Sequence, residues 1–421
     1  MRPATIAGVC ACVAAIVIAL SAGTPLDYGS SACALNPACD DASQPIDALA
    51  EGHVGEFFRR QQLIGPVSEV LSAPFVAVAG DDRLDRYRAA LLPCLLAVAL
   101  LGAYLARIAA KRGRPWWFQF LIALGAVINP VTFWVIRFGQ PVEFVGAVLV
   151  AVAGLAACRG RVTTAGLVAG VAVATKLWAL VAIPLLAFAL PAGWRRFLAT
   201  AVVSGGLLIA IPALAAPHVF HENVTALGRL GSVPGTVSKI SLWYPATDPV
   251  EFDSPLRVAP GGVIETQHIA GLELPRRLAQ LAHGLILLAG LGIGIAWVLR
   301  SRPGNGPAIL LAIALALLLR CVLDPGVRSY YHEPFLLAVL SYETLVRRWL
   351  PGLAIAGAAG VEGISIAAKH VDSGGVLSAL YLAWTLPLAA AMAIELIRLP
   401  SDRRGAWRQQ TAAVGAGSAG G

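Results

Sequence analysis

Charged residues are scarce in this sequence. They make up 13% of the 421 residues, whereas a soluble protein carries about 25%, and hydrophobic residues make up 57%. This shortage excludes an ordinary soluble protein and indicates a polytopic membrane protein. The net charge of +8 is distributed over several short loops and forms no single patch. We therefore expect a lipid bilayer around the chain and no nucleic-acid partner.

Nucleotide-binding and metal-binding motifs are also missing. The sequence contains neither a Walker loop nor a dinucleotide fingerprint. The seven cysteines show no metal-ligand spacing, and His218 and His221 lack a clear third ligand. Cys33 and Cys39 lie close enough in sequence to form a disulfide if their side of the membrane is oxidising, with two free thiols as the alternative.

Apolar segments fill most of the chain, and some are shorter than the roughly 20 residues that span a bilayer. We interpret the stretch 163–190 as two half-length helices, because basic residues flank it at both ends. The sequence predicts a single all-α membrane domain over residues 1–400, with about 12 membrane helices, and a disordered tail over 401–421. The expected segments are 4–23, 87–110, 116–135, 142–158, 163–177, 178–191, 197–216, 276–299, 306–323, 333–346, 349–368 and 376–397.

Charge sorting predicts the orientation of the helices. With two helices in 163–190, the short basic loops all fall on one side, which the positive-inside rule assigns to the cytoplasm. Most of the 24 acidic residues fall on the other side. We expect a multi-pass protein of the cytoplasmic membrane, with a first helix that is retained and both termini in the cytoplasm.

Two outward loops are long, at residues 24–86 and 217–276. The first contains apolar residues at helical spacing, which predicts amphipathic helices lying on the membrane. One set opens after Gly65-Pro66. The two sets are Ile46, Leu49, Phe57 and Phe58, and Val67, Val70, Leu71, Phe75 and Val78.

The first outward loop also carries an acidic pair, Asp40 and Asp41. A carboxylate at this position is a candidate general base for a hydroxyl acceptor. The alternative is a solvated loop in which Asp41 or Ser43 caps the next helix. Asp47 fits the surface of that helix better.

A short outward turn from Asp324 to Pro334 combines a cation, an imidazole and two phenols. Arg328, His332 and Tyr331 are candidates for binding a phosphate, and Tyr330 and Asp324 for lining the same cavity. The alternative is an interfacial aromatic belt.

Lys176 lies within an apolar stretch, where a charge is costly and indicates function, with a snorkelling lysine as the alternative. Gln140 and Glu143, in another outward turn, could face the same cavity. Arg320 has the spacing for a structural i,i+4 ion pair with Asp324.

These residues favour an enzyme whose substrate arrives through the lipid, because soluble activated sugars are absent outside the membrane. A polyprenyl-phosphate sugar meets this condition: cations would bind its phosphate, and a carboxylate would activate the acceptor. A transporter or flippase for a lipid-linked or anionic substrate is the alternative, and it predicts inverted repeats. We find no such repeats. An assembly subunit with a decayed site is a third possibility.

Several segments resemble GT-C glycosyltransferases, in particular family 87-like, polyprenol-phosphate-mannose-dependent mannosyltransferases of actinobacteria. The stretches Gly139 to Glu143 and Ala165 to Leu180 resemble Gly-His-Pro-Glu-Glu and Ala-Lys-Gln-Trp-Ala segments of such enzymes. Asp324-Pro with Tyr330-Tyr331-His332, and the segment that begins at Asp40, resemble further segments of these proteins.

The resemblance implies a GT-C-like bundle whose first outward loop carries the catalytic aspartate, with Asp40 as the best match and Asp41 next. It implies inverting transfer of a sugar, mannose by resemblance, from a polyprenyl-phosphate donor to a cell-envelope glycolipid or glycan on the outer face. No cofactor is expected, with a divalent cation as the open alternative. Gln140 and Val142 depart from the expected His and Glu, which leaves room for an altered sugar or a lost activity.

Overall fold

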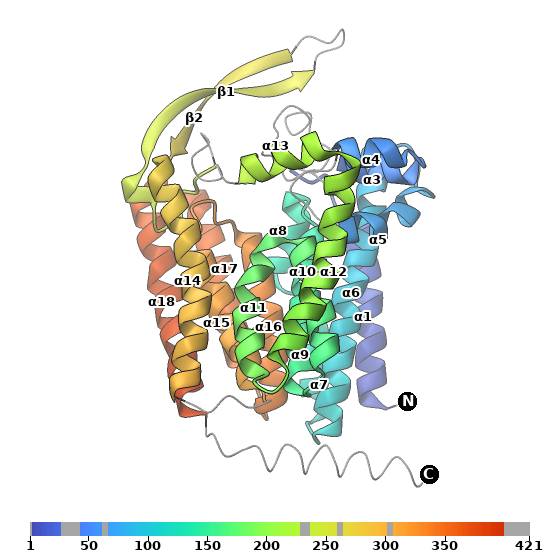
Figure 1. Cartoon of the computed structure of the whole chain (residues 1–421), viewed down its shortest axis with the longest axis vertical. Helices are drawn as coiled ribbons and strands as arrows, with labels where there is room; N and C mark the ends of the chain where they lie inside the picture. Colours follow the sequence, from blue (N-terminus) through green and yellow to red (C-terminus); the bar gives the residue numbers. More distant parts are fainter. Residues whose placement is uncertain are drawn as a thin grey trace.

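Helices running side by side form the body of the molecule, and a β-hairpin extends beyond one end of this bundle (Figure 1). The computed structural model describes residues 2–26, 43–60, 66–227, 236–258, 264–300 and 306–399. The start of α1 and the end of α18 lie at the same end of the bundle (Figure 1).

Seven helical segments of the described chain are long and apolar enough to cross a membrane. One of them, Trp116–Phe138, is interrupted. The helices are α1 (Pro3–Ser21), α6 (Arg83–Lys111), α7 (Trp116–Val127) followed by α8 (Pro130–Phe138), α12 (Trp194–Ala215), α14 (Arg276–Arg300), α17 (Gly352–His370) and α18 (Gly374–Arg398).

Some of the shorter helices lie inside the bundle. Nearly every side chain of α15 and α16 is buried, so these helices are covered by protein and need not match the thickness of the bilayer by themselves. By contrast, α12 and α14 expose apolar side chains such as Leu207 and Leu288. The shorter helices are α9 (Val142–Cys158), α10 (Val162–Thr175), the 3₁₀ turn η1 (Leu177–Val181) with α11 (Ala182–Ala189), α15 (Ala308–Leu323) and α16 (Glu333–Val346).

The predicted segments thus correspond closely to helices, and the all-α membrane fold is confirmed. The division of 163–190 at Lys176 is also confirmed. The segment 116–135 was wrongly taken as continuous. Asn129 interrupts it by accepting a hydrogen bond from Thr132 N (3.0 Å), which caps α8, and by donating to the carbonyl oxygens of Gly125 and Ala126 (both 3.2 Å) at the end of α7. Pro130 then occupies the first turn of α8.

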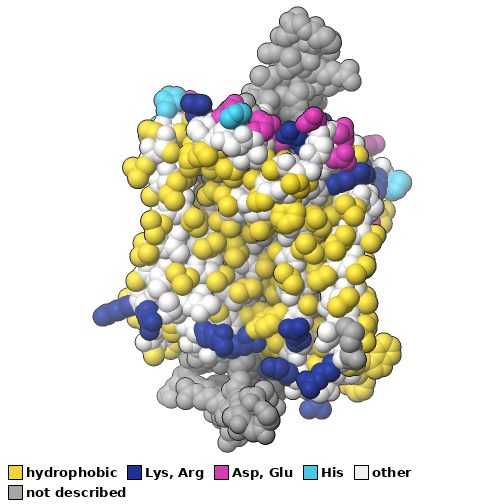
Figure 2. All heavy atoms as spheres, turned by 90° about the vertical axis from the view of Figure 1, so that its right-hand side faces the viewer, with side chains coloured by type: hydrophobic (Ala, Val, Ile, Leu, Met, Phe, Trp, Pro, Cys, Tyr) yellow, Lys and Arg dark blue, Asp and Glu magenta, His cyan; other side chains and the backbone are white. Residues whose placement is uncertain are grey.

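Charge divides the bundle into two ends. On the face shown in Figure 2, the lower end carries Lys and Arg side chains, whereas the upper end carries the Asp and Glu side chains together with some Lys and Arg. We call these the basic end and the acidic end. The loop between α11 and α12 lies at the basic end (Figure 1), and Arg195 and Arg196 follow it in the first turn of α12.

The first long loop forms three short helices at the acidic end: α3 (Ser43–Ala50), α4 (Val54–Arg60) and α5 (Pro66–Val76). Helices are therefore present at both predicted sets of apolar residues, with the first set divided between α3 and α4, and their position on the membrane stays a prediction. In α5 the polar face is turned inward, where Ser72 Oγ donates to Ala90 O of α6 (3.0 Å), and apolar Val70 is exposed. Asp47 of α3 lies 3.1 Å from Arg86 of α6, so it joins these two elements.

The second long loop contains a helix, α13 (Pro217–Leu227), and an antiparallel hairpin of β1 (Asp248–Val258) and β2 (Ile264–Glu273). The sequence analysis did not predict the hairpin. Between them, the 3₁₀ turn η2 (Tyr244–Ala246) follows Trp243, whose indole Nε1 donates to Leu323 O at the end of α15 (2.7 Å). The second loop is thereby attached to the helical bundle.

Buried polar contacts join α16 to α17. The Glu343 carboxylate of α16 accepts from the backbone N–H groups of Leu353 (2.9 Å) and Ala354 (3.0 Å), in the first turn of α17. Arg347 also lies 3.6 Å from this carboxylate. Glu343 is fully buried, so these donors replace the water that it lacks.

Candidate active site

A tight turn between α8 and α9 places Glu143 inside the bundle. Gly139 ends α8 with φ = 75°, a left-handed conformation that favours glycine. Gln140 N then donates to Val135 O (3.0 Å), and Pro141 precedes the first residue of α9. Glu143 therefore lies in the first turn of α9 and is 2% exposed. The other end of α9 adjoins Arg159, so Glu143 lies toward the acidic end.

Lys176 lies beside Glu143 because α10 ends one residue earlier. Its backbone is extended (φ −150°, ψ 124°), between α10 and η1. The Nζ atom lies 3.3 Å from Glu143 Oε1, and both side chains are nearly excluded from solvent. The structure thus brings together two residues that the sequence analysis predicted to face one cavity.

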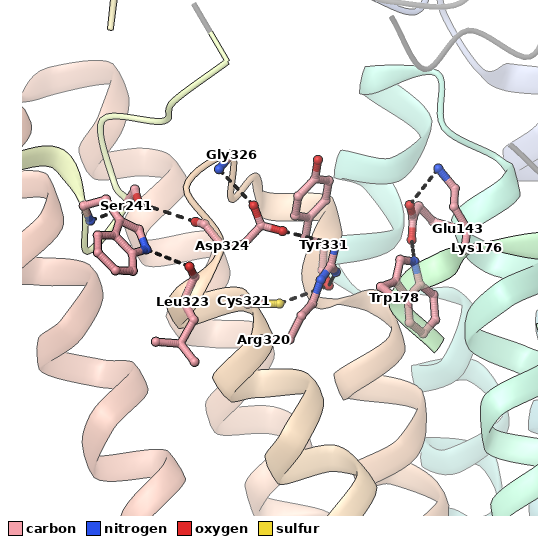
Figure 3. A network of polar contacts seen from close by, with 11 residues as sticks. Glu143, Lys176, Trp178, Ser241, Arg320, Cys321, Leu323, Asp324, Gly326 and Tyr331 are labelled. Atoms are coloured by element: carbon pink, nitrogen blue, oxygen red, sulfur yellow. Dashed lines mark hydrogen bonds and ion pairs between the residues drawn. The ribbon is translucent and has the colours of Figure 1, made fainter. Parts of the chain in front are cut away.

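Trp178 engages the second oxygen of the same carboxylate. Its indole Nε1 donates to Glu143 Oε2 (3.1 Å), so the carboxylate lies between an ammonium and an indole (Figure 3). A glycine on α9 makes room for this ring: a Cβ atom at Gly146 would lie 3.0 Å from the Trp178 ring. Sequence analysis did not single out Trp178 as a site residue, although it lies two residues after Lys176.

Arg320, near the end of α15, lies between two aromatic rings. Its guanidinium carbon is 4.5 Å from the centroid of the Tyr331 ring and 5.8 Å from that of Trp178. The predicted i,i+4 ion pair with Asp324 is present at 3.5 Å. Asp324 also accepts from Gly326 N (2.9 Å), so its carboxylate holds both the arginine and the turn that follows α15 (Figure 3).

The residues described so far form one cluster: Glu143, Lys176, Trp178, Arg320, Asp324 and Tyr331. Arg328 lies beside this cluster, is exposed, and comes just before the 3₁₀ turn η3 (Ser329–His332). Its guanidinium carbon is 5.6 Å from the centroid of the Phe138 ring at the end of α8. Tyr330 is buried between Phe138 (5.2 Å between centroids) and Tyr331 (4.8 Å). A row of aromatic rings thus connects Arg328 with Arg320.

His332 is placed differently from its predicted phosphate-binding partners. It is fully buried, with Nδ1 3.1 Å from Ser329 O and Nε2 3.0 Å from the hydroxyl of Tyr381 on α18. Burial lowers the pKa of this imidazole to about 4. His332 is therefore neutral at physiological pH, and its geometry favours a role in holding η3 over direct contact with a phosphate. Nothing in the sequence indicates its partner Tyr381.

Glu333, the first residue of α16, is fully buried next to the cluster. Among the residues that the structure describes, neither of its carboxylate oxygens has a hydrogen-bond partner. Sequence analysis noted Glu333 only as part of the turn.

The segment around Ser241 supports the site from the second loop. Ser241 Oγ donates to Asp324 O (3.4 Å), and Ser238 N donates to Pro325 O (2.9 Å). Ser378 of α18 in turn donates to Ser241 O (2.8 Å). The turn that carries Asp324 and Arg328 is therefore held from both α18 and the second loop.

The cluster accounts for most of the predicted site residues, but not for all. Gln140 is buried in the turn before α9. Asp40 and Asp41, with the cysteines Cys33 and Cys39, lie outside the described residues. Within the described part of the chain, no three His, Cys, Asp or Glu side chains come together as metal ligands.

Comparisons with known proteins give three results for this chain. The crystal structure of ArnT from Cupriavidus metallidurans bound to undecaprenyl phosphate is similar at a TM-score of 0.47 and 14% identity, over 93% of this chain and 77% of that one. No curated protein sequence matches. The model of glycosyltransferase family 87 matches residues 65–325, which include every residue of the cluster from Glu143 to Asp324. The chain therefore belongs to glycosyltransferase family 87, of the GT-C type, and is a multi-pass membrane glycosyltransferase.

Proposed function

We propose that this enzyme transfers mannose from a polyprenyl-phosphate donor to a cell-envelope glycolipid or glycan, on the outer face of the cytoplasmic membrane. The observation that carries the proposal is the buried cluster of Lys176, Arg320 and Glu143, with the exposed Arg328 beside it, toward the acidic end of a family 87 glycosyltransferase.

The position of the cluster supports a donor carried by lipid. If the basic end lies in the cytoplasm, as the positive-inside rule predicts, the acidic end lies outside, where nucleotide sugars are absent. The cluster lies among the helices of the bundle (Figure 3), and Glu143 lies at the end of α9 opposite Arg159, toward the acidic end.

Arg328 and Lys176 are the proposed phosphate ligands. Arg328 is exposed, and a guanidinium can bind a phosphate through two parallel hydrogen bonds. Lys176 adds a second positive charge, which Glu143 holds in place at 3.3 Å. Tyr331 adds a hydroxyl from the same turn. Fixed cations stabilise the charge that develops on the phosphate as it leaves.

The other residues position these ligands. Glu143 holds Lys176 at 3.3 Å, and Asp324 holds Arg320 at 3.5 Å. His332 supports the turn behind Arg328 through Ser329 and Tyr381. We thus revise the expected role of His332 from ligand to positioning residue.

The proposed base is Asp40 or Asp41, carried over from the resemblance to the family. The acceptor oxygen attacks the anomeric carbon as the bond from that carbon to the phosphate oxygen breaks. The acceptor proton moves to the aspartate, and the lipid phosphate leaves as an anion. One displacement inverts the anomeric configuration, and no metal ion takes part in this proposal.

The test is transfer of radiolabelled sugar in membranes, with Asp40→Asn and Asp41→Asn assayed separately. We expect one of the two variants to lose transfer by about 100-fold or more, as is typical when a general base is removed, and the other to retain it. Full activity in both variants contradicts the mechanism.

Donor and metal are tested in the same membranes. Polyprenyl-phosphate mannose should be used, whereas the glucose and arabinose analogues should not, and EDTA should leave the rate unchanged. Transfer from a soluble nucleotide sugar without a lipid carrier would overturn the donor assignment.

A further inference from the structure

A groove on the membrane-facing surface lies away from the candidate active site. It runs between α6, α9 and the start of α10 and has a volume of about 430 Å³. Such a volume lies within the range of small-molecule sites, roughly 300–1,000 Å³. Its walls are apolar along α6 and α9, with Ala97, Leu100, Val148 and Val152 among the lining residues. Leu100 is 62% exposed.

One end of the groove is polar and basic. Arg159 and Arg161, in the loop between α9 and α10, line it together with Thr164. The Arg159 guanidinium carbon lies 5.1 Å from the centroid of the Tyr104 ring, which also lines the groove. Among the described residues, neither arginine forms an ion pair with a carboxylate. The two positive charges are therefore not neutralised by the part of the chain that the structure describes.

Glu143 and Arg159 mark opposite ends of α9. This helix has 17 residues, so its ends lie roughly 25 Å apart. The groove therefore opens at the basic end and is separated from the Lys176–Glu143 pair by most of the bundle. No step of the proposed transfer uses it.

We propose that this groove binds an anionic phospholipid of the leaflet at the basic end. One acyl chain lies along the apolar wall of α6 and α9, and the headgroup phosphate lies at Arg159 and Arg161, with the Thr164 hydroxyl as a further donor. Basic pockets between membrane helices bind anionic headgroups in this way. The site is independent of the proposed sugar transfer, because it shares no residue with the candidate active site.

Charge complementarity selects this occupant. A neutral lipid would leave the two guanidinium groups without a counter-ion, and a soluble anion would leave the apolar wall unused. The competing interpretation is that both arginines only reach the headgroup layer, as basic residues near helix ends commonly do. That interpretation predicts that lipid binding does not depend on the groove. It also predicts that replacing Arg159 and Arg161 has the same effect as replacing other arginines at the basic end.

The experiment uses the full-length protein in lipid nanodiscs and measures the fraction of spin-labelled lipid that is immobilised. Phosphatidylglycerol is compared with phosphatidylcholine of the same acyl chains. In the Arg159→Gln/Arg161→Gln variant we expect roughly 30-fold weaker binding of phosphatidylglycerol, since each surface charge contributes about fivefold. The matched control is Arg195→Gln/Arg196→Gln, which removes two exposed arginines from the first turn of α12 at the same end.

A second variant tests the groove without changing any charge. Ala97→Trp fills the apolar wall and should abolish the preference for phosphatidylglycerol. Leu207→Trp, at an exposed apolar position of α12, should preserve it. Equal losses in the two arginine variants, unchanged binding in Ala97→Trp, or equal immobilisation of both lipids in the wild type would each overturn the proposal.

Discussion

The Glu143 carboxylate joins two parts of the chain that meet only in the folded protein. Its oxygens bind Lys176 and Trp178, and this ion pair is buried to more than 90% on both sides. A buried pair contributes little net stability, whereas removal of one partner leaves a charge without compensation. The pair therefore acts as a unit.

The coupling of Glu143 and Lys176 can be tested with single and double variants. Lys176→Met alone should destabilise the protein by about 3–5 kcal/mol, and Glu143→Gln/Lys176→Met should recover part of that loss without recovering transfer. Thermal unfolding in detergent and sugar transfer in membranes measure the two effects. Glu222→Gln, which removes one partner of the exposed His218–Glu222 pair, should melt like the wild type. A Lys176→Met protein of normal stability would contradict the prediction.

His332 predicts a dependence of stability on pH. Burial lowers its pKa from the usual 6.5 to about 4, so the neutral form is favoured in the folded protein. The contribution of the neutral His332 to the free energy of unfolding is complete above about pH 6.5 and decreases as the pH falls toward 4. Thermal unfolding of the wild type should therefore lose more stability between pH 6.5 and 4 than that of His332→Gln. Identical slopes for the two proteins would argue against a buried neutral imidazole.

The sequence indicated part of this site through the cost of charge in an apolar segment. Lys176 was a candidate because a charge is costly in an apolar segment, and Glu143 because it follows a polar turn before α9. The sequence could not indicate Trp178 or Tyr381, because an indole or phenol in an apolar helix is equally compatible with ordinary packing. Burial also changes the interpretation of His332. Its place in a turn with Arg328 suggested a phosphate ligand, whereas the buried imidazole is neutral.

Among the helices, α10 and α12 approach each other through small residues. A Cβ atom at Gly170 would lie 2.2 Å from Ala201 O, and Ser204 Oγ donates to Leu167 O (3.0 Å) across the interface. Small residues at such positions allow membrane helices to pack closely. Because α10 ends at Thr175, one residue before Lys176, this packing also determines where the lysine lies.

Gly170→Leu should therefore separate α10 from α12. We expect a loss of about 1–3 kcal/mol or more from overpacking, together with reduced transfer. Gly206→Leu is the matched control on α12, where a Cβ atom has no neighbour within 4 Å. Retention time in gel filtration and melting temperature measure both variants. Equal losses in both variants would show that the effect of Gly170→Leu does not depend on the contact between α10 and α12.

The boundaries of the helices could be predicted from the sequence where charged residues flank them. They could not be predicted where a single polar residue ends one helix and caps the next. The arginines that flank 163–190 led to the correct division of this stretch into two helices. Asn129 was overlooked because one amide within an apolar run changes hydropathy little, yet it caps α8 and binds the end of α7. The β-hairpin depends on pairing between distant residues in a long loop, which local patterns do not reveal.

The whole molecule has one basic end and one acidic end (Figure 2), and this asymmetry predicts its orientation. In a cysteine-free background, His218→Cys at the start of α13 should react with a membrane-impermeant maleimide in intact cells, because this side chain is exposed beyond the acidic end. Arg195→Cys, at the basic end, should react only after the membrane is opened. The reverse pattern would invert the topology and remove the argument for a lipid-linked donor.

The shortness of α16 affects how the protein is made. This helix has 14 residues, or roughly 21 Å, against a hydrocarbon thickness of about 30 Å. It also carries Glu333 and Glu343, both fully buried. Such a segment partitions poorly into lipid alone, and Glu343 finds its backbone donors only when the start of α17 has been synthesised. Membrane integration of α16 during translation must therefore wait for the helices that follow it, so the centre of the enzyme is completed late in its biogenesis.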